Sequence, residues 1–327
     1  MPGLATTNAR APDYASCSGC GLCLLVCPVW RRSSDISLTP LGRAKALQLG
    51  AAAAEIAESV QSCTLCGACE PVCPEEIGLV EMTLDLRRQL LPAAAVPGLR
   101  TRMEAQLAQP PAPQGSANAV LLPDSALRAR PATLARAAVL LGGAIADDDG
   151  SDIALALEAG MPIPAPRLER FLGPLRATKH MVVADGLLLR RLRQWLPDSE
   201  CTSLGVTLSG LAAVRSALRA SDLYVIEPRA YHADYQRLVR YYDALRAEAG
   251  CVFNLDLQRI AIPAAARSLA QRLGLEAFDD NVQTRWILQG RQVARIVVES
   301  LEDGEAFAQV SACPVVHLAD LADDGTS

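Results

Sequence analysis

Short apolar runs alternate with amphipathic stretches from about residue 118 to residue 320. Six of the apolar runs predict strands, at 119–122, 181–184, 223–226, 251–254, 296–298 and 315–317. The intervening stretches carry apolar residues at helical spacing and predict helices near 131–141, 186–195, 209–219, 231–248, 263–273 and 302–310. Alternation of strands with helices is typical of an α/β fold with a largely parallel sheet. Two of the strands lead into helices in a similar way, which suggests two related halves.

The first 91 residues show a different, helical pattern. Thr39 is a good N-cap and Pro40 stands at the first helical position, ahead of apolar residues at helical spacing. Residues 79–90 are also amphipathic. A proline-rich stretch follows, in which 109–115 has no hydrophobic periodicity. We therefore expect a helical domain over 1–91, a linker over 92–117 and an α/β domain over 118–327.

Composition narrows the class of protein. The 327 residues are 50% hydrophobic and 20% charged, which fits a soluble protein with about two domains. The net charge is −5. The sequence has no basic patch with interleaved aromatic residues, so nucleic-acid binding is not expected. The first 14 residues lack the apolar centre of a secretory signal, and the longest uncharged apolar run, 137–146, is too short to span a bilayer. We expect a cytoplasmic protein whose 11 cysteines are reduced and serve metal or redox chemistry.

Eight of the cysteines form two identical motifs. Each has the spacing C-x2-C-x2-C-x3-C-P, and the members are Cys17, Cys20, Cys23 and Cys27, then Cys63, Cys66, Cys69 and Cys73. This is the ligand run of bacterial [4Fe–4S] ferredoxins, in which the fourth cysteine binds the other cluster. The motifs thus predict two [4Fe–4S] clusters. One is held by Cys17, Cys20, Cys23 and Cys73, and the other by Cys63, Cys66, Cys69 and Cys27.

Two alternatives to these clusters are a pair of zinc sites and a reduced cysteine-rich loop. Zinc ribbons use paired C-x2-C elements and have no use for a third cysteine at the same spacing, so the clusters are favoured. The 35 residues between Cys27 and Cys63 are longer than a compact ferredoxin needs, and they carry the predicted helix. The clusters are therefore expected to lie among helices.

These residues resemble a family of iron–sulfur subunits, those of glycolate oxidase, lactate-utilisation complexes and heterodisulfide reductase. The helical insert of that family commonly carries Ser/Thr-Pro-x-Gly-Arg, matched here by residues 39–43. The resemblance covers about residues 14–91. It implies a chain that relays single electrons through two clusters inside a larger redox complex.

The resemblance weakens in the second part of the chain. Members of the family often carry Cys-Cys-Gly elements there, which hold a further cluster. At the corresponding places this chain has Pro123-Asp124-Ser125, Asp148-Asp149-Gly150, Asp185-Gly186 and Glu299-Ser300. The remaining cysteines, Cys201, Cys251 and Cys313, are isolated and are interpreted as small buried hydrophobic residues. The α/β domain is therefore interpreted as a degenerate relative of that cysteine-rich domain.

Other candidate residues favour structural roles. The three histidines, His180, His232 and His317, belong to no recognisable motif, and Asp147–Asp149 is expected to be a solvated loop. Tyrosines and leucines of 231–245 share one helical face. We interpret this face as part of the core rather than as a surface that binds a partner. Two interpretations remain for Trp30, Arg31 and Arg32. They are equally consistent with a docking face for an electron donor and with an ordinary surface. No dinucleotide or Walker motif is present, so flavin or nucleotide binding is not expected.

The sequence therefore predicts an electron-transfer subunit of an oxidoreductase complex rather than the subunit that converts the substrate. Electrons would arrive from a flavin- or metal-containing dehydrogenase and leave towards a quinone-linked membrane subunit or a soluble acceptor. Two other functions stay open. One is a thiol/disulfide reductase that uses Cys201, Cys251 or Cys313, and the other is a structural zinc-binding scaffold.

Overall fold

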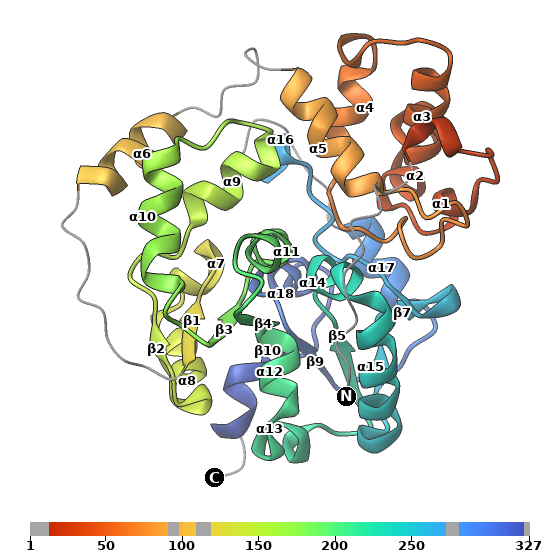
Figure 1. Ribbon diagram of the computed structural model, residues 1–327. Coiled ribbons are helices and arrows are strands. Elements are labelled where there is room, and N and C mark those ends of the chain that lie inside the picture. Colours follow the sequence, from red (N-terminus) through yellow and green to blue (C-terminus); the bar gives the residue numbers. More distant parts are fainter. Residues whose placement is uncertain (1–12, 91–97, 109–118, 273–280, 324–327) are drawn as a thin grey trace, which may run out of the picture.

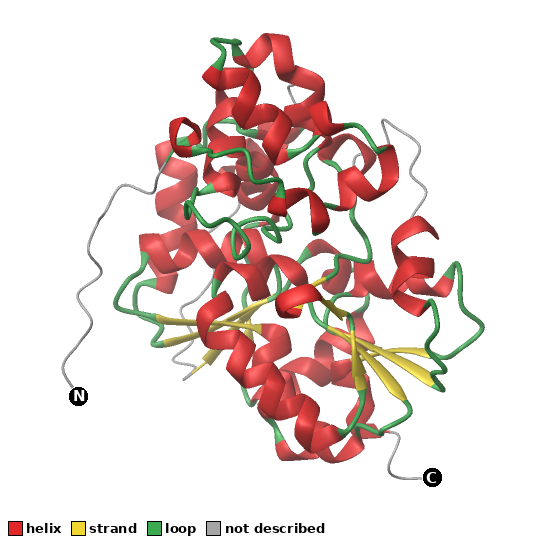
Figure 2. Ribbon diagram, turned by 90° about the vertical axis from the view of Figure 1, so that its right-hand side faces the viewer, coloured by secondary structure: helices red, strands yellow, loops and turns green. Residues whose placement is uncertain are grey.

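A computed structural model describes residues 13–90, 98–108, 119–272 and 281–323 (Figure 1). The N-terminal helices form a layer of their own, which lies against a larger part that contains the strands. Figure 2 shows the strands in two groups beneath these helices. No helix within the described ranges is long and apolar enough to cross a membrane.

The N-terminal layer consists of short helices and loops. Its elements are η1 (Tyr14–Ser16), α1 (Leu22–Leu25), α2 (Pro28–Ser33), η2 (Ile36–Leu38), α3 (Pro40–Gln48), η3 (Ala53–Ile56), α4 (Ala57–Ser62) and α5 (Leu79–Gln89). The predicted start of α3 is confirmed, because the Thr39 hydroxyl accepts a hydrogen bond from the Gly42 amide at 3.2 Å. The amphipathic stretch at 79–90 forms α5, whose Leu84 and Leu86 are buried. This segment is helical, as predicted.

Helix α6 (Leu99–Ala108) lies inside the interval predicted to be a linker. Its Leu99 and Met103 are buried in a hydrophobic cluster with Ala156 and Ala159. Part of the interval is therefore packed structure, because two apolar residues one helical turn apart give α6 a buried face. The stretch 109–115, which motivated the prediction, lies outside the described residues.

The first sheet is parallel throughout and has the strand order β2-β1-β3-β4. Its strands are β1 (Ala119–Leu122), β2 (Ala144–Ile145), β3 (His180–Val183) and β4 (Glu200–Ser203). The helices of this half are α7 (Ser125–Arg128), α8 (Pro131–Leu141), α9 (Ser151–Ala159), α10 (Ala165–Leu175), α11 (Gly186–Trp195), α12 (Leu204–Gly210) and α13 (Ala212–Ala217). The sheet is buried where β1 and β3 pair, with Leu122 opposite Val183.

The second sheet is also parallel and has the order β10-β9-β5-β6. Its strands are β5 (Asp222–Val225), β6 (Val252–Phe253), β9 (Arg295–Val298) and β10 (Val315–His317). The other elements of this half are α14 (Pro228–Ala233), α15 (Tyr235–Ala249), β7 (Leu255–Asp256), η4 (Leu257–Arg259), β8 (Ile260–Ala261), α16 (Leu269–Arg272), α17 (Asn281–Leu288), α18 (Leu301–Ala308) and η5 (Leu318–Asp323). When the strands of each sheet are numbered along the chain, both sheets have the order 2-1-3-4.

The α/β class with parallel sheets is thus confirmed, although the described residues form two parallel four-stranded sheets instead of one, together with an antiparallel pair of β7 and β8. Three predicted helices differ from the observed ones. The helix predicted at 209–219 is interrupted at Leu211, whose backbone is extended, and that at 231–248 is interrupted at Asp234. Of 263–273, only Leu269–Arg272 is described as helical, because the Ala265 amide instead donates a hydrogen bond to the Asp303 carboxylate at 2.8 Å.

The largest hydrophobic cluster lies between helices and both sheets. The tyrosine-rich face of α14 and α15 belongs to it, and Tyr231, Leu238, Tyr242 and Leu245 are buried there. The prediction that this face is core is confirmed. A second cluster joins the first sheet to the N-terminal layer, because Leu65, Val80 and Leu84 pack with residues of β3 and α11.

Candidate metal centre

The predicted cysteines lie on loops that short helices hold in place. Cys17, Cys20 and Cys23 stand on the loop around α1, and Cys27 is the N-cap of α2, with Pro28 at its first position. The second motif begins at the end of α4, for which Cys63 is the C-cap. Its later members are Cys66, Cys69 and Cys73, on the loop that leads to α5.

The eight cysteines surround two cavities. One cavity is lined by Cys17, Cys20, Cys23 and Cys73, and we call it the first cysteine cavity. The other, the second cysteine cavity, is lined by Cys27, Cys63, Cys66 and Cys69. Each cavity therefore takes three cysteines from one motif and the fourth from the other.

Helix α3 separates the two cavities. Pro40 lines both, while Arg43 lines the second cavity and Ala44 lines the first. A β-carbon on Gly42 would lie 2.2 Å from the Ile36 carbonyl oxygen, so only glycine allows α3 to approach η2 so closely. The buried Arg43 donates a hydrogen bond to the Ser59 carbonyl at 2.7 Å and so joins α3 to α4. The Thr-Pro-x-Gly-Arg sequence thus places one helix between the cysteine groups.

Hydrogen bonds from the end of α3 fix the first cysteine loop. The Lys45 ammonium donates to the Cys17 carbonyl at 2.8 Å, and the Gln48 amide donates to the carbonyls of Tyr14 and Cys17. Cys20 is exposed, and the other three cysteines of this cavity are half-buried. The first cysteine cavity therefore lies close to the molecular surface.

Burial and mutual repulsion act on the thiols. Burial, followed by the nearby thiolates of Cys27, Cys17 and Cys20, raises the pKa of Cys23 to about 12. Burial also raises the pKa of Cys66 to about 12. Four thiolates that line one cavity need a strongly positive group between them. An iron–sulfur core supplies that positive charge when it is bound.

Arginine side chains offset this effect at one cysteine. Burial disfavours the Cys63 thiolate, but Arg43 and Arg87, together with hydrogen bonds from Leu65 and Thr83, outweigh burial and lower the pKa of Cys63. Within the described ranges, no three Cys, His, Asp or Glu side chains converge closely enough for a single metal ion. The four cysteines of a cubane site bind four different irons, so they surround a cavity instead of meeting at one point. The donor set and its spread therefore fit a cluster.

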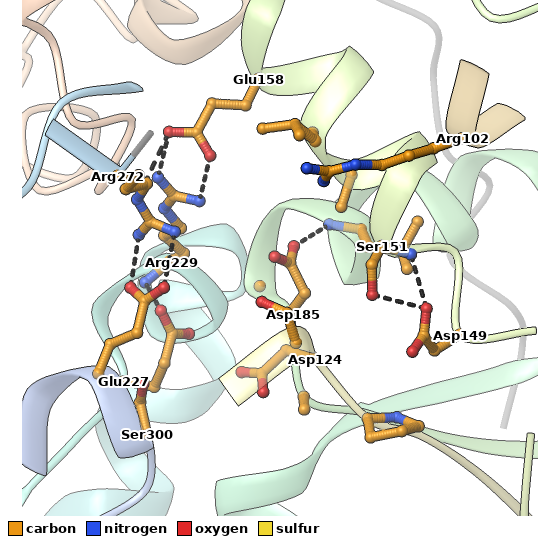
Figure 3. Close-up of a pocket in the computed structure, with 18 residues that line it drawn as sticks. Arg102, Asp124, Asp149, Ser151, Glu158, Asp185, Glu227, Arg229, Arg272 and Ser300 are labelled. Atoms are coloured by element: carbon orange, nitrogen blue, oxygen red, sulfur yellow. Dashed lines mark hydrogen bonds and ion pairs between the residues drawn. The ribbon is translucent and has the colours of Figure 1, made fainter. Parts of the chain in front are cut away.

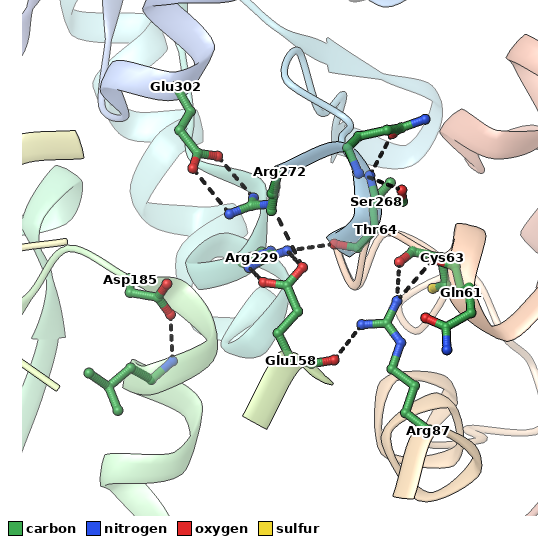
Figure 4. Close-up of polar contacts among 12 residues, drawn as sticks. Gln61, Cys63, Thr64, Arg87, Glu158, Asp185, Arg229, Ser268, Arg272 and Glu302 are labelled. Carbon is green, nitrogen blue, oxygen red and sulfur yellow. Dashed lines mark hydrogen bonds and ion pairs between the residues drawn. The ribbon is translucent and has the colours of Figure 1, made fainter. Parts of the chain in front are cut away.

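The second cysteine cavity is tied to the α/β part by a buried ion pair (Figure 4). Arg229, at the start of α14, binds the Glu158 carboxylate through both of its terminal nitrogens, at 2.9 and 3.1 Å. The same guanidinium donates to the Thr64 carbonyl at 2.8 Å, one residue after Cys63. Arg87 of α5 donates to the backbone carbonyls of Cys63 and Glu158. Since Arg229 and Glu158 are 71 positions apart, no local sequence pattern could have indicated this ion pair.

His232, on the same helix α14, contacts the second cysteine loop directly. Its Nδ1 lies 2.8 Å from the Cys66 carbonyl oxygen, which can only accept, so Nδ1 carries the proton. A β-carbon on Gly67 would lie 3.0 Å from the His232 Cβ, and Gly67 also has a φ of +76°. Burial lowers the pKa of His232 to about 4. The sequence favoured a structural role for this histidine. Its contact with the cysteine loop became visible only in the structure.

The acidic residues at the places of the missing Cys-Cys-Gly elements have structural contacts. Asp124 and Asp185 are N-caps, of α7 and α11, and each accepts a hydrogen bond from a backbone amide of its helix. Glu299 is buried and accepts hydrogen bonds from the hydroxyls of Tyr224 and Tyr242, at 2.7 and 2.6 Å. Burial raises the pKa of Glu299 to about 7.

Other predicted residues turn inward. Arg31 forms an ion pair with Asp256 at 2.7 Å and lies 3.6 Å from the ring centre of Trp286, so it is part of an intramolecular contact. The loop Asp147–Asp149 was expected to be solvated, but Asp148 pairs with the buried Arg167, and Asp149 pairs with Arg128. The expectation holds only for Asp147, which is exposed, because Asp148 and Asp149 are half-buried and pair with arginines 19 and 21 positions away.

The remaining cysteines lie apart, in three different hydrophobic clusters. Cys201, on β4, packs with residues of β3 and α11, Cys251 packs with Tyr242 and Phe253, and Cys313 lies beside Val293 and Val315. Burial raises the pKa of Cys251 to about 11 and also raises that of Cys201. His180 pairs with the exposed Glu200, and His317 is buried with its Nε2 3.2 Å from the Glu299 carbonyl.

Comparison with known families adds one match. Residues 13–77 match the model of the 4Fe-4S dicluster domain. No curated protein and no solved structure matches this chain. The match covers the first motif, the helical insert and the second motif, and it supports at least one [4Fe–4S] cluster and a role in iron–sulfur electron transfer.

Proposed function

We propose that this chain passes single electrons through two [4Fe–4S] clusters within a larger oxidoreductase complex. The observation that carries the proposal is the pair of cysteine cavities, each lined by three cysteines from one motif and one from the other. This crossed arrangement is that of dicluster ferredoxins. The dicluster-domain match over 13–77 supports the same function.

The ligands would be the cysteines that line each cavity. Cys17, Cys20, Cys23 and Cys73 would hold one cluster, and Cys63, Cys66, Cys69 and Cys27 the other. A bound cluster supplies the one-electron chemistry, and the chain supplies thiolates, partial exclusion of water and fixed positions. Arg43 and Arg87 contribute positive charge beside Cys63. Hydrogen bonds and burial around a cluster are the factors through which a protein sets the cluster's potential.

The α/β part would serve assembly and docking. We propose that it consists of two related halves and descends from the cysteine-rich domain of heterodisulfide reductase-type subunits. Both parallel sheets have the order 2-1-3-4, and in each the residue two positions after its first and third strands is the N-cap of a helix. Acidic residues and serine occupy these positions here, so we propose no cluster in this part of the chain.

The partners would lie on either side of this relay. A dehydrogenase subunit that contains flavin or a metal would donate electrons, and a quinone-linked membrane subunit or a soluble carrier would accept them. Affinity purification of the chain under anaerobic conditions tests this context. Recovery of the chain without any redox partner would contradict the assignment as a subunit.

Metal analysis of the anaerobically purified protein tests the clusters. Two cubanes require about eight iron and eight sulfide per chain, in a brown protein with a [4Fe–4S] electron paramagnetic resonance (EPR) spectrum after reduction. A colourless protein with about two zinc per chain would instead support the structural zinc scaffold. About four iron per chain would reduce the proposal to one cluster.

Single cysteine substitutions test the crossed ligand sets. Cys27→Ser and Cys63→Ser lie in different motifs but line the same cavity, so both should alter the same EPR signal. Cys73→Ser should alter the other signal, together with Cys17→Ser. Cys251→Ser is the matched control, since this buried cysteine lies in a hydrophobic cluster away from both cavities. Pairing of Cys27 with Cys17 in one signal would contradict the crossed assignment.

A further inference from the structure

A cavity of about 370 Å³ lies where the carboxyl ends of both sheets meet (Figure 3). Its wall includes the residues two positions after β1, β3, β5 and β9, which are Asp124, Asp185, Glu227 and Ser300. Parallel α/β sheets bind their ligands in crevices at the carboxyl ends of the strands. The volume is near the lower end of the range for small-molecule sites, about 300–1,000 Å³.

Three carboxylates of this cavity have no cationic partner. Asp124, Asp185 and Glu227 accept hydrogen bonds from backbone amides at the starts of their own helices, and no ion pair joins them to an arginine or lysine within the described part of the chain. The acids on the other side of the cavity are neutralised, because Glu158 pairs with Arg229, and Glu302 pairs with Arg272. Among the described residues, this side of the cavity therefore holds three carboxyl groups without an ion-pair partner, and Arg272 and Arg229 act on Asp124 and Glu227 only as nearby charges.

Burial raises the pKa values of two of these carboxyl groups. Loss of hydration raises the pKa of Asp124 to about 7, with Glu302 and Asp185 adding repulsion. Burial also raises the pKa of Glu227 to about 8, with Asp303 adding repulsion. A positively charged group placed among these carboxylates would restore their ionised forms and gain a charge-assisted hydrogen bond.

The opposite wall supplies one free cation. Arg102 of α6 points its guanidinium into the cavity from the far side (Figure 3). Within the described ranges it forms no ion pair or hydrogen bond, whereas the two other arginines of the wall are paired. Leu99 and Met103 bury the inner face of α6, so the helix that carries Arg102 is held in place. An unpaired guanidinium is well suited to a carboxylate, which it can bind through two parallel hydrogen bonds.

We propose that this cavity binds a small zwitterion, with a positively charged amine facing Asp124 and Asp185 and a carboxylate facing Arg102. A free α-amino acid has this chemistry and a size that fits the cavity. The inference does not depend on the clusters, because none of the cysteines of either motif lines this cavity.

Binding to the intact, anaerobically purified protein is the first test. The standard amino acids are screened by thermal shift, and any that raise the melting temperature are titrated by calorimetry. Putrescine and succinate serve as probes that carry charges of one sign only. We expect saturable binding of at least one amino acid, and at least tenfold weaker binding of both control probes. Tighter binding of succinate or putrescine, or no saturable binding by any amino acid, would overturn the proposal.

Two substitutions remove one charge each. Asp185→Asn keeps the N-cap, because asparagine caps helices as well as aspartate does. Arg102→Gln changes an exposed side chain, so the fold is retained. Each should weaken amino-acid binding about tenfold or more, with the iron content unchanged. Arg176→Gln is the control, since its exposed ion pair with Glu169 lies outside the cavity, and its affinity should equal that of the wild type. Unchanged affinity in either charge-removing variant overturns the proposed orientation.

Discussion

The two cysteine cavities differ in what surrounds them. The first has an exposed member, Cys20, and its loop is held by hydrogen bonds from Lys45 and Gln48 of the N-terminal layer. The second contains the buried Cys27 and is contacted by Arg229 and His232 of the α/β part. In our proposal, the first cluster therefore exchanges electrons with a partner, whereas the properties of the second cluster depend on contacts with the α/β part.

Among the substitutions that test this difference between the two cavities, Arg229→Ala is expected to have the largest effect. Removal of the guanidinium leaves the Glu158 carboxylate, 5% exposed, without its bidentate partner and with Arg272, at 3.7 Å, as its remaining ion-pair partner. Breaking a buried pair typically costs about 3–5 kcal/mol of unfolding free energy, and Arg272 should keep the loss near the lower end of this range. Urea unfolding measures the loss, and EPR should show a change in the signal of the second cluster only.

The control for this experiment is Arg176→Ala, which breaks an exposed pair with Glu169 and should leave both measurements unchanged. If Arg229→Ala does not fold, Arg229→Lys keeps the charge without the planar fork and should give a smaller loss. Equal changes in both cluster signals would show that the two cavities do not differ in their coupling to the α/β part.

The next effect depends on pH and concerns Glu227, the N-cap of α14. Burial raises the pKa of Glu227 from 4.5 to about 8, so between these values the folded chain holds a proton that the unfolded chain has released. The resulting stabilisation is complete below about pH 4.5 and is lost as the pH rises through 8. Because α14 carries Arg229 and His232, we expect the second cavity to loosen first at high pH.

Glu227→Gln tests this, because glutamine cannot titrate. Between pH 6 and pH 8.5 the wild type should lose about 1–3 kcal/mol more of its unfolding free energy than the variant loses. The two proteins are compared because Asp124, Glu299 and Asp303 also have pKa values raised by burial to about 7. Parallel pH profiles of wild type and variant would contradict the role of Glu227.

A third substitution should affect both cavities equally. In Gly42→Ala, the new β-carbon would lie 2.2 Å from the Ile36 carbonyl oxygen, so α3 must shift, and Pro40 of α3 lines both cavities. Such overpacking costs about 1–3 kcal/mol. Gly173→Ala is the matched control, because a β-carbon there meets no atom within 4 Å and should not destabilise the protein. A change confined to one cluster signal would mean that α3 does not separate the cavities as described.

The elements that sequence predicted best are those with strong local signals. Helices α8 and α11 have the predicted bounds, because Pro131 begins one and the Asp185 cap begins the other. Strand β4, Glu200–Ser203, was missed because it is an edge strand whose residues are mostly polar. The break at Asp234 was missed because hydrophobic periodicity continues across it from Tyr231 to Tyr235.

The candidate site likewise contains some residues that the sequence predicted and others that it did not. The spacing of the two motifs, together with the ferredoxin rule that the fourth cysteine binds the other cluster, predicted the two groups of four cysteines that line the cavities. The contacts of Arg229 and His232 could not be predicted, because Arg229 lies 71 positions from Glu158 and His232 lies 166 positions from Cys66. Charges that meet only through tertiary structure leave no periodic pattern in the sequence.

The smallest expected effect is that of His232→Phe, which keeps an aromatic ring against Gly67 but loses the hydrogen bond to the Cys66 carbonyl. Loss of one such bond typically costs about 1 kcal/mol of stability. Redox titration followed by EPR should show a shifted midpoint potential for the second cluster and an unchanged one for the first. His180→Phe is the control, because this exposed histidine pairs with Glu200 at the far end of β3 and contacts neither cavity. An equal shift of both midpoints would mean that His232 acts through the fold as a whole, and the coupling of the second cavity to the α/β part would then rest on Arg229 and Arg87.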